Sequence, residues 1–379
     1  MSTARLQLDL PDGRREIAVV AGDETLPLSE LLGRRGFPLN TRCGGRGLCR
    51  GCEVELRAGA LQRLADDTPV AGGTPSMFKS CQLRLTPGSE VSLEVPARSL
   101  LKHEPAVVTE FRSNVSWASD PLAPPARYGA AVDVGTTTVA LLLCDLESGR
   151  VLAEASAFNA QIRFGEDVLT RIQFCTGGAG AVQQLQHAIG EETIQPLLNE
   201  ACASAALDPR EVGVMTVAGN TTMQHLLAGV DPSPLGVYPF RPVFLDHRIH
   251  APGELGLAFG GKAAEVHLLP SPASYVGADL AAGIVATGML YDEGPVLLVD
   301  AGTNGEIIAK VDHRLIGCAT AAGPAFEGAG LSCGARGVRG AIERVRLAGD
   351  PFAAELGVIG DERRPIGICG SGYVDFLWE

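Results

Sequence analysis

The chain lacks long apolar runs and any excess of basic charge. Its 379 residues contain no apolar run of about 18, the length that a membrane-spanning helix requires. The N-terminal MSTARLQLDLPDG has no apolar stretch of the kind found in signal peptides. A net charge of -13 is unfavourable for binding nucleic-acid phosphates. These absences predict a cytoplasmic protein without a membrane or nucleic-acid partner, which binds a protein or a small molecule instead.

The composition still allows a large core, because 46% of the residues are hydrophobic. The length predicts two or three domains. The first hundred residues alternate apolar and polar side chains with the period of strands. Strands are expected at RLQLDL, REIAVV, CEVELRAG, KSCQLRLT and SEVSLEV, and a helix at TLPLSELLGRRG.

Ten cysteines divide into a cluster and a scattered set. A disulfide framework is not expected in a reducing compartment, so clustered cysteines indicate metal or redox chemistry. The cluster has the spacing Cys43-x5-Cys49-x2-Cys52, and 28 residues separate Cys52 from Cys81. The other six are predicted to be small buried side chains, and they are Cys144, Cys175, Cys202, Cys318, Cys333 and Cys369.

This spacing favours a 2Fe-2S cluster with Cys43, Cys49, Cys52 and Cys81 as ligands. Glycines within TRCGGRGLCRGCEVEL let the backbone wrap a cluster closely. The five residues between Cys43 and Cys49 are one more than plant-type ferredoxins have between their first two cysteines. The loop therefore resembles that of the adrenodoxin-like variant of 2Fe-2S ferredoxins. Zinc is the alternative, but zinc sites usually offer two close cysteine pairs and Cys81 is solitary. Three basic side chains could steer an acidic electron donor, namely Arg42, Arg46 and Arg50.

Two similar hairpins follow a proline-containing linker predicted at residues 98–127. In AVDVGTTTVALLL an apolar strand is predicted to end at Asp133, and in GPVLLVDAGTNGEII another is predicted to end at Asp300. The two aspartates are 167 residues apart, which indicates an internal repeat of subdomain size. Two such hairpins can close on one phosphate chain from opposite sides. One hairpin alone would be weak evidence, since it could be an ordinary turn.

The hairpins supply the candidate catalytic and nucleotide-binding residues. Asp133 is expected to hold hydrated Mg²⁺, and Asp300 is expected to orient the attacking water or the metal. Glu306 is a weaker catalytic candidate, which strand alternation could turn toward the cleft. The candidate nucleotide-binding residues lie in the two turns, and they are Gly135, Thr136, Thr137, Thr138, Gly302, Thr303, Asn304 and Gly305.

Two segments between the hairpins allow a structural and a functional interpretation. In FGEDVLTRI, Asp167 and Arg171 lie four residues apart on a predicted helix, and an ordinary surface ion pair is the favoured interpretation. In VAGNTTMQHLL, Asn220 can cap a helix. That helix N-terminus could equally face a nucleotide or an anionic group of a partner.

The paired hairpins resemble the phosphate loops of the acetate and sugar kinase, heat-shock chaperone and actin superfamily. AAGPAFEGAG at residues 321–330 and GICGSGYVDFL at residues 367–377 fit this resemblance. The superfamily implies that a turn made by Gly370, Ser371 and Gly372 supports the adenosine. Close packing of a helix against a strand is the alternative role for these small residues.

Together with the cysteine loop, the motifs AVDVGTTTVALLL, FGEDVLTRI, VAGNTTMQHLLAGVDPSPLG and VDAGTNGEI resemble the reductive activators of corrinoid enzymes. The resemblance implies α+β and α/β architecture, with a β-grasp 2Fe-2S ferredoxin domain at 1–97, the linker at 98–127, and an actin-like ATPase domain of two RNase H-like subdomains at 128–293 and 294–379. It implies ATP-dependent transfer of one electron to Co(II) of a corrinoid protein. The implied cofactors are the 2Fe-2S cluster, ATP and Mg²⁺, and a low-potential electron donor is implied as a further partner. A homodimer is compatible with the sequence.

The chain ends at DFLWE, and family members continue further, so the second subdomain is expected to be incomplete. Two other functions stay open on the sequence. The first is a ferredoxin-type electron-transfer module on a non-hydrolysing, actin-like docking domain. The second is a kinase of a small substrate, for which a ferredoxin domain gives no reason.

Overall fold

The structure is a computed structural model that forms two compact units, one of residues 1–103 and 326–379 and one of residues 104–325. It describes residues 5–11, 13–20, 22–41, 45, 47, 50–72, 76–96, 99–100, 126–302, 304–320, 333–349, 353–361 and 365–379. Most of the predicted linker and the AAGPAFEGAG segment lie outside these residues. The predicted domain boundaries therefore stay a prediction.

The N-terminal part of the first unit is a five-stranded sheet with the order β2-β1-β8-β3-β6. β1 pairs antiparallel with β2 and parallel with β8, so the chain must cross from one strand to the other. Alternate residues of β1 point inward, and Leu6 and Leu8 are fully buried against α1 residues such as Leu31. The elements are β1 (Arg5–Leu10), β2 (Gly13–Ala18), α1 (Leu28–Arg34), β3 (Glu53–Ala58), β6 (Met77–Lys79) and β8 (Glu90–Glu94).

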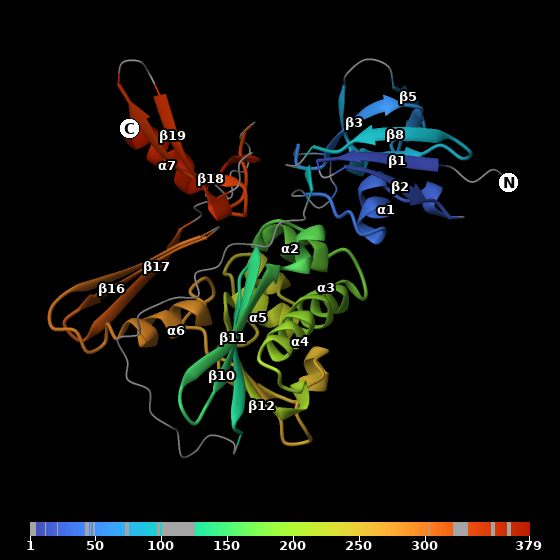
Figure 1. Ribbon diagram of the computed structural model, residues 1–379. Helices are drawn as coiled ribbons and strands as arrows, with labels where there is room; N and C mark the ends of the chain where they lie inside the picture. The colour runs from blue at the N-terminus through green and yellow to red at the C-terminus, as the bar shows by residue number, and fades with distance from the viewer. Residues whose placement is uncertain are drawn as a thin grey trace. The chain divides into compact units, whose positions relative to one another are not determined.

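A small second sheet, β5-β4-β7, completes this part of the unit. The predicted strand KSCQLRLT is interrupted, because a 3-10 turn at Ser80–Gln82 separates β6 from β7 and carries Cys81. The five strand segments and the helix predicted from the sequence all contain the expected element (Figure 1). The small sheet consists of β4 (Ala60–Arg63), β5 (Pro69–Ala71) and β7 (Leu83–Leu85).

The C-terminal part of the first unit is the sheet β19-β18-β20 with α7 packed on β18. Gly370, Ser371 and Gly372 form the first turn of α7, whereas the sequence placed them in a turn before the helix. A Cβ at Gly372 would lie 2.3 Å from the carbonyl oxygen of Ile342, so only glycine allows this close packing. The elements are β18 (Ala341–Ala348), β19 (Ala353–Val358), β20 (Gly367–Ile368) and α7 (Gly370–Trp378).

The second unit is built on a six-stranded sheet with the order β11-β10-β9-β12-β14-β13. β9, β10 and β11 form an antiparallel meander, and β12 and β14 run parallel to β9. The parallel strands bring the carboxyl ends of β9 and β12 to one edge, where ligands of α/β sheets usually bind. The strands are β9 (Tyr128–Val134), β10 (Thr138–Asp145), β11 (Arg150–Phe158), β12 (Val212–Gly219), β13 (Arg248–His250) and β14 (Glu265–Leu268).

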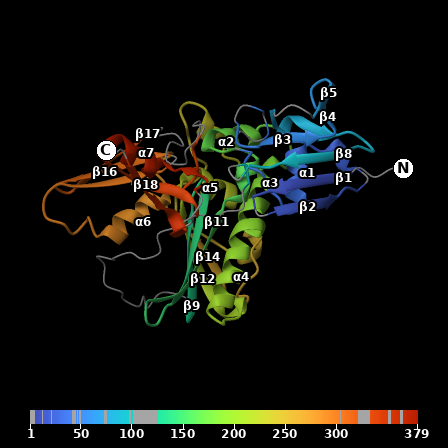
Figure 2. The same cartoon turned by 45° about the horizontal axis from the view of Figure 1, so that its top comes forward.

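Helices cover both faces of this sheet. α3 and α4 lie on one side, and α6 lies on the other and contacts β12 (Figures 1 and 2). Fully buried residues such as Leu141, Leu198 and Met215 form the core between sheet and helices. The helices are α2 (Val168–Cys175), α3 (Ala181–Ile189), α4 (Gln195–Ser204), α5 (Thr221–Leu227) and α6 (Ala278–Thr287).

A three-stranded antiparallel sheet, β15-β16-β17, belongs to the same unit. α6 also contacts β15, and Ile308 of β16 is buried against α6 residues such as Leu280 and Ile284. The helix is therefore shared by the two sheets of this unit. The strands are β15 (Val296–Ala301), β16 (Gly305–Val311) and β17 (Arg314–Thr320).

The prediction that the six scattered cysteines are buried is confirmed for three of them and wrong for two, and the sixth is only half-buried. Cys318 and Cys333 are exposed, whereas Cys175, Cys202 and Cys369 are buried and Cys144 is half-buried. Cys318 is exposed because it lies on β17, an edge strand whose residues are all exposed. Apolar neighbours in sequence do not reveal that a strand lies at a sheet edge.

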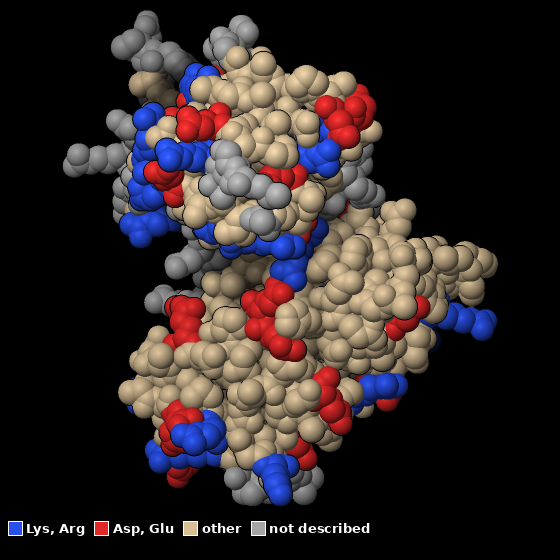
Figure 3. Space-filling model, turned by 90° about the vertical axis from the view of Figure 1, so that its right-hand side faces the viewer, with Lys and Arg blue, Asp and Glu red and all other residues tan. Residues whose placement is uncertain are grey.

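Charge is distributed over the surface without a dominant sign on the face seen in Figure 3, where basic and acidic side chains are interspersed. No helix within the described ranges combines the length and apolar character needed to cross a membrane.

Candidate functional site

The first aspartate hairpin forms a tight loop at the carboxyl end of β9. The loop is residues 135–137, and the Gly135 N-H donates to the Thr138 carbonyl oxygen at 2.9 Å. A Cβ at Gly135 would lie 2.5 Å from that same oxygen, so the turn requires glycine. This loop, called the phosphate loop below, follows Asp133 by one residue because β9 continues to Val134.

Asn220 connects the phosphate loop to the end of the parallel strand β12. Its side-chain oxygen accepts from the Met223 N-H at 3.0 Å and caps α5, and its Nδ2 donates to Thr136 Oγ1, also at 3.0 Å. The predicted cap is therefore confirmed. Thr136 is buried, and its hydroxyl oxygen accepts this hydrogen bond from the Asn220 side chain. Thr137 and Thr138 are half-buried.

Four carboxyl groups come together beside this loop. Asp133 lies on β9, Asp279 in the first turn of α6, and Asp300 and Glu306 lie directly opposite each other on β15 and β16. Directly opposed residues of an antiparallel pair face the same side of the sheet. The structure thus brings together the three acidic residues predicted from the sequence and adds Asp279. We refer to these four residues as the carboxylate cluster.

Desolvation raises the pKa of all four carboxyl groups of the cluster, and charge repulsion adds to this at Asp133, Asp279 and Glu306. Desolvation, followed by repulsion from Asp279 and Asp300, raises the pKa of Asp133 to about 6. The same causes raise the pKa of Glu306 to about 7. Desolvation also raises the pKa of Asp279 and of Asp300. Among the described residues, no three His, Cys, Asp or Glu side chains are arranged so that they could hold a metal ion directly. A cation attracted by the negative charge of this cluster would therefore keep water ligands, as Mg²⁺ in proteins commonly does.

Sequence reasoning missed Asp279. It lies in YVGADLAAG, and an acidic residue in the first turn of a helix ordinarily complements the helix dipole. Only the packing of α6 between the two sheets places this aspartate against Asp133 and Glu306. A local motif therefore could not distinguish it from other acidic residues at helix N-termini.

We expect Glu306→Gln to stabilise the Mg²⁺-free protein in a pH-dependent manner. Glu306 is 7% exposed, and folding raises its pKa from 4.5 to about 7. The folded state therefore binds more protons than the unfolded state between these values, and stability falls as the pH rises through them. The glutamine variant should unfold with the wild-type free energy below pH 4.5 and gain up to roughly 3 kcal/mol above pH 7.

Urea unfolding between pH 4 and pH 8 with a chelator measures this difference. Glu147→Gln, in the exposed turn between β10 and β11, is the matched control and should show no such trend. A Glu306→Gln effect that is the same at every pH would contradict the assigned cause.

The predicted surface ion pair between Asp167 and Arg171 is wrong. Asp167 caps α2, accepting from the Thr170 N-H at 2.7 Å, while Arg171 is fully buried. The guanidinium donates to the Gly165 and Thr136 carbonyl oxygens instead. The spacing of four residues suggested a surface pair, because such pairs are common on exposed helix faces. It could not indicate the true partner of Arg171, since Thr136 lies 35 residues away in sequence.

The structure describes most of the other predicted nucleotide-binding residues, which lie in the second hairpin and at the start of α7. In the second hairpin, Gly302 N-H donates to the Asn304 carbonyl oxygen at 3.0 Å, and Gly305 is buried at the start of β16. Thr303 lies outside the described residues. Gly370, Ser371 and Gly372 belong to the other compact unit, and the contact of Gly372 with Ile342 supports their packing role.

Two of the four predicted cluster ligands can be described, and they lie together. Cys52 and Cys81 are buried in the core of the first unit. Interaction between their thiols lowers the pKa of Cys52 and raises that of Cys81, as expected when two thiols share one proton. Thiolates are the ligands of iron-sulfur clusters, so this pair fits a shared metal centre. Cys43 and Cys49 lie outside the described residues.

The backbone of the cysteine loop is fixed by side chains near Cys81. Gln82 Nε2 donates to the Gly45 carbonyl oxygen at 2.6 Å and lies 3.6 Å from Cys81 Sγ, and Lys79 donates to the Gly47 carbonyl oxygen. Arg50 pairs with Glu53 at 2.8 Å. The role of Arg50 in steering an acidic electron donor stays a prediction. Arg42 and Arg46 lie outside the described part of the chain.

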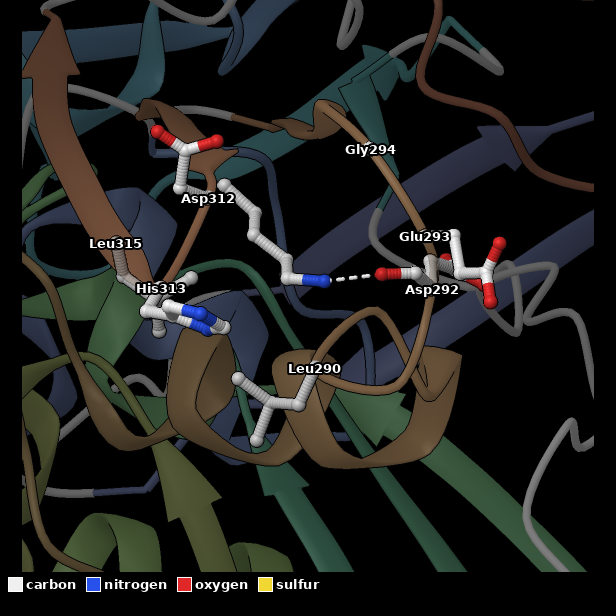
Figure 4. Close-up of a pocket in the computed structure, with 8 residues that line it drawn as sticks. Leu290, Asp292, Glu293, Gly294, Asp312, His313 and Leu315 are labelled. Atoms are coloured by element: carbon white, nitrogen blue, oxygen red, sulfur yellow. Dashed lines mark hydrogen bonds between the residues drawn. The ribbon is translucent and has the colours of Figure 1, made fainter.

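A separate hollow of about 530 Å³ lies at the far end of β16. It is lined by Leu290, Asp292, Asp312 and His313, among others, and the Lys310 ammonium donates there to the Asp292 carbonyl oxygen (Figure 4). Lys310 is four residues beyond Glu306 on β16, roughly 13 Å along the strand. The hollow is therefore distinct from the carboxylate cluster.

Comparison with known proteins identifies the class of this fold. Residues 128–292 match the family model described as the RACo middle region, and residues 294–379 match the C-terminal domain of RACo, the ASKHA domain. ASKHA denotes the acetate and sugar kinase, heat-shock and actin superfamily. The actin-like ATPase fold predicted from the two hairpins is confirmed.

Three similar proteins define the family more narrowly. The corrinoid activation enzyme RamQ of Eubacterium limosum is 31% identical over 403 aligned positions, covering 92% of this chain and 67% of RamQ. The [Co(II) methylated amine-specific corrinoid protein] reductase of Methanosarcina barkeri is 29% identical over 234 positions, 59% of this chain and 41% of that protein. The solved reductive activator for corrinoid, iron-sulfur protein superposes with a TM-score of 0.61 at 26% identity, over 98% of this chain and 72% of that one. The chain belongs to the family of reductive activators of corrinoid proteins, as the sequence predicted.

Proposed function

We propose that this protein reactivates a corrinoid protein by reducing its cobalt from Co(II) to Co(I), at the expense of ATP. The observation that carries the proposal is the pairing, in one chain of this family, of a buried cysteine pair with a carboxylate cluster beside a phosphate loop. The corrinoid cobalt is the substrate and gains one electron. A low-potential donor outside the chain restores that electron.

Cys43, Cys49, Cys52 and Cys81 would hold the 2Fe-2S cluster, which when bound supplies single electrons at low potential. The chain's own contribution is to bury this site and to hold its loop. Cys52 and Cys81 are 0% and 3% exposed, and Gln82 places an amide donor 3.6 Å from the Cys81 sulfur. Burial and N-H donors near the sulfurs are two means by which proteins set the potential of such a centre.

The residues around the phosphate loop would bind and hydrolyse MgATP. Asp133 would hold the hydrated Mg²⁺, which neutralises phosphate charge when bound. Asp300 would orient the attacking water, as in phosphoryl transfers that depend mainly on positioning. Glu306 has a pKa of about 7, so it is suited to accept the proton of that water near neutral pH. Asp279 would hold the pKa of both Asp133 and Glu306 high through its charge.

Coupling to ATP is reasonable on energetic grounds. Plant-type 2Fe-2S centres have potentials near about -400 mV, and formation of Co(I) is a harder reduction. A change of state worth about 5.5 kcal/mol shifts an equilibrium about 10⁴-fold. At about 59 mV per tenfold change for one electron, such a change supplies about 230 mV of driving force.

Phosphate release tests the ATPase part of the proposal. The purified chain with MgATP and a Co(II) corrinoid protein should release phosphate faster than the chain alone. Nucleotide binding without any phosphate release would favour the alternative of an electron-transfer module on a docking domain. Phosphorylation of a small substrate would indicate a kinase instead.

A further inference from the structure

A buried polar node behind the phosphate loop sets the orientation of the loop's peptide groups. The node consists of Asn159, Gln161 and Arg171, which are 1%, 0% and 0% exposed. Asn159 Nδ2 donates to the Gly135 carbonyl oxygen at 3.0 Å, and Arg171 Nη2 donates to the Thr136 carbonyl oxygen at 2.5 Å. Two consecutive carbonyls of the phosphate loop are thus bonded from within the fold.

The remaining donors of Arg171 hold the guanidinium in one position. Its Nε donates to the Gly165 carbonyl oxygen at 2.9 Å, and its Nη1 donates to Gln161 Oε1 at 3.0 Å and lies 3.1 Å from Met223 Sδ. Gln161 is fixed in turn, because its Nε2 donates to the Leu185 carbonyl oxygen at 2.8 Å. The planar guanidinium of Arg171 has hydrogen-bond partners at all three of its nitrogens. Rotating it would leave buried polar groups without hydrogen bonds, which costs free energy.

The direction of a carbonyl determines the direction of the next N-H. In a trans peptide the C=O and the following N-H point in opposite directions. The Thr136 N-H therefore points away from Asn159, and the Thr137 N-H points away from Arg171. N-H groups presented in this way by a tight loop form an anion-binding concavity.

We propose that Arg171 is a positioning residue for the terminal phosphates of a nucleoside triphosphate. It holds the peptide between Thr136 and Thr137 so that the Thr137 N-H faces the phosphate chain, and the guanidinium itself does not touch the nucleotide. This inference rests on the proposed nucleotide function. It deepens that function by assigning the positioning of the phosphate loop to a residue of α2, which lies outside both hairpins.

The test compares Arg171→Met and Arg171→Lys with the wild-type chain in binding MgATP and AMP. Lysine keeps the positive charge but replaces the planar guanidinium, which donates in several fixed directions, by a compact ammonium group. We expect the affinity for MgATP to fall at least tenfold in the methionine variant and by a smaller factor in the lysine variant. The affinity for AMP, which lacks the terminal phosphates, should change less than twofold in both.

Leu198→Ala is the control, because it removes a fully buried apolar side chain of α4, which should lower stability, and this side chain makes none of the node's hydrogen bonds. It should leave the ratio of MgATP to AMP affinity unchanged. An equal loss of both affinities in the Arg171 variants, or no loss, would overturn the positioning role while leaving the proposed function intact. If the methionine variant does not fold, the ratio of MgATP affinity to AMP affinity in the lysine variant tests the positioning role. A wild-type chain that binds no MgATP would remove both the inference and the nucleotide function.

Discussion

Replacing Cys81 by alanine should abolish the proposed 2Fe-2S cluster and, with it, the proposed reductive activity. Cys81 is 3% exposed, and its thiol interacts with that of Cys52 inside the core of the first unit. A 2Fe-2S cluster needs four thiolates, and alanine leaves a small apolar side chain that cannot bind iron. We expect the visible absorbance and the iron and sulfide content of the anaerobically reconstituted protein to fall to background.

Cys202→Ala provides the matched control for this loss. Cys202 is also fully buried, but it lies in α4 of the other compact unit. Its removal should cost stability without changing the iron content. The Cys81 variant should still bind MgATP, since the carboxylate cluster and the phosphate loop belong to that other unit. Full iron and sulfide content in Cys81→Ala would contradict the ligand assignment.

Replacing Asp300 by asparagine should reduce MgATP hydrolysis roughly 100-fold or more. Asparagine has nearly the same shape, so the change removes little besides the charge that, in the proposed function, orients the attacking water. The charge of Asp300 also raises the pKa of Asp133, Asp279 and Glu306. The remaining activity should therefore have its pH profile displaced to lower pH.

Steady-state phosphate release between pH 5 and pH 9 measures both effects. Asp246→Asn is the control, because Asp246 is exposed and its ion-pair partner Arg248 lies 3.7 Å away in the same unit. It should leave rate and profile unchanged. A fall in rate without a displaced profile would contradict the electrostatic coupling within the carboxylate cluster.

The fold was largely predictable because its strands show clear alternation and its hairpins repeat. AVDVGTTTVALLL and GPVLLVDAGTNGEII both fold into the expected strand, turn and strand. The cysteine spacing likewise indicated that Cys52 and Cys81 share a site. The hairpin signals are local in sequence, and the cysteine signal depends on the close spacing of Cys43, Cys49 and Cys52.

The errors concern residues whose role depends on contacts between distant segments. Arg171 resembled a surface residue because its carbonyl partner Thr136 comes from another element. Asp279 was overlooked because α6 must pack between two sheets before its first turn reaches Asp133. The exposure of Cys318 depends on β17 being an edge strand. Periodicity cannot report such contacts, since they arise from tertiary packing.

In the proposed function, electron transfer to cobalt is coupled to ATP hydrolysis in this chain. The direct measurement is an anaerobic visible spectrum of a Co(II) corrinoid protein mixed with the reconstituted chain and a low-potential donor, before and after addition of MgATP. We predict that the Co(I) spectrum develops only when MgATP is present, and that it fails to develop with either Cys81→Ala or Asp300→Asn. Co(I) formation at the same rate and extent without nucleotide, or its absence with several corrinoid proteins in the presence of MgATP, would contradict the proposed function.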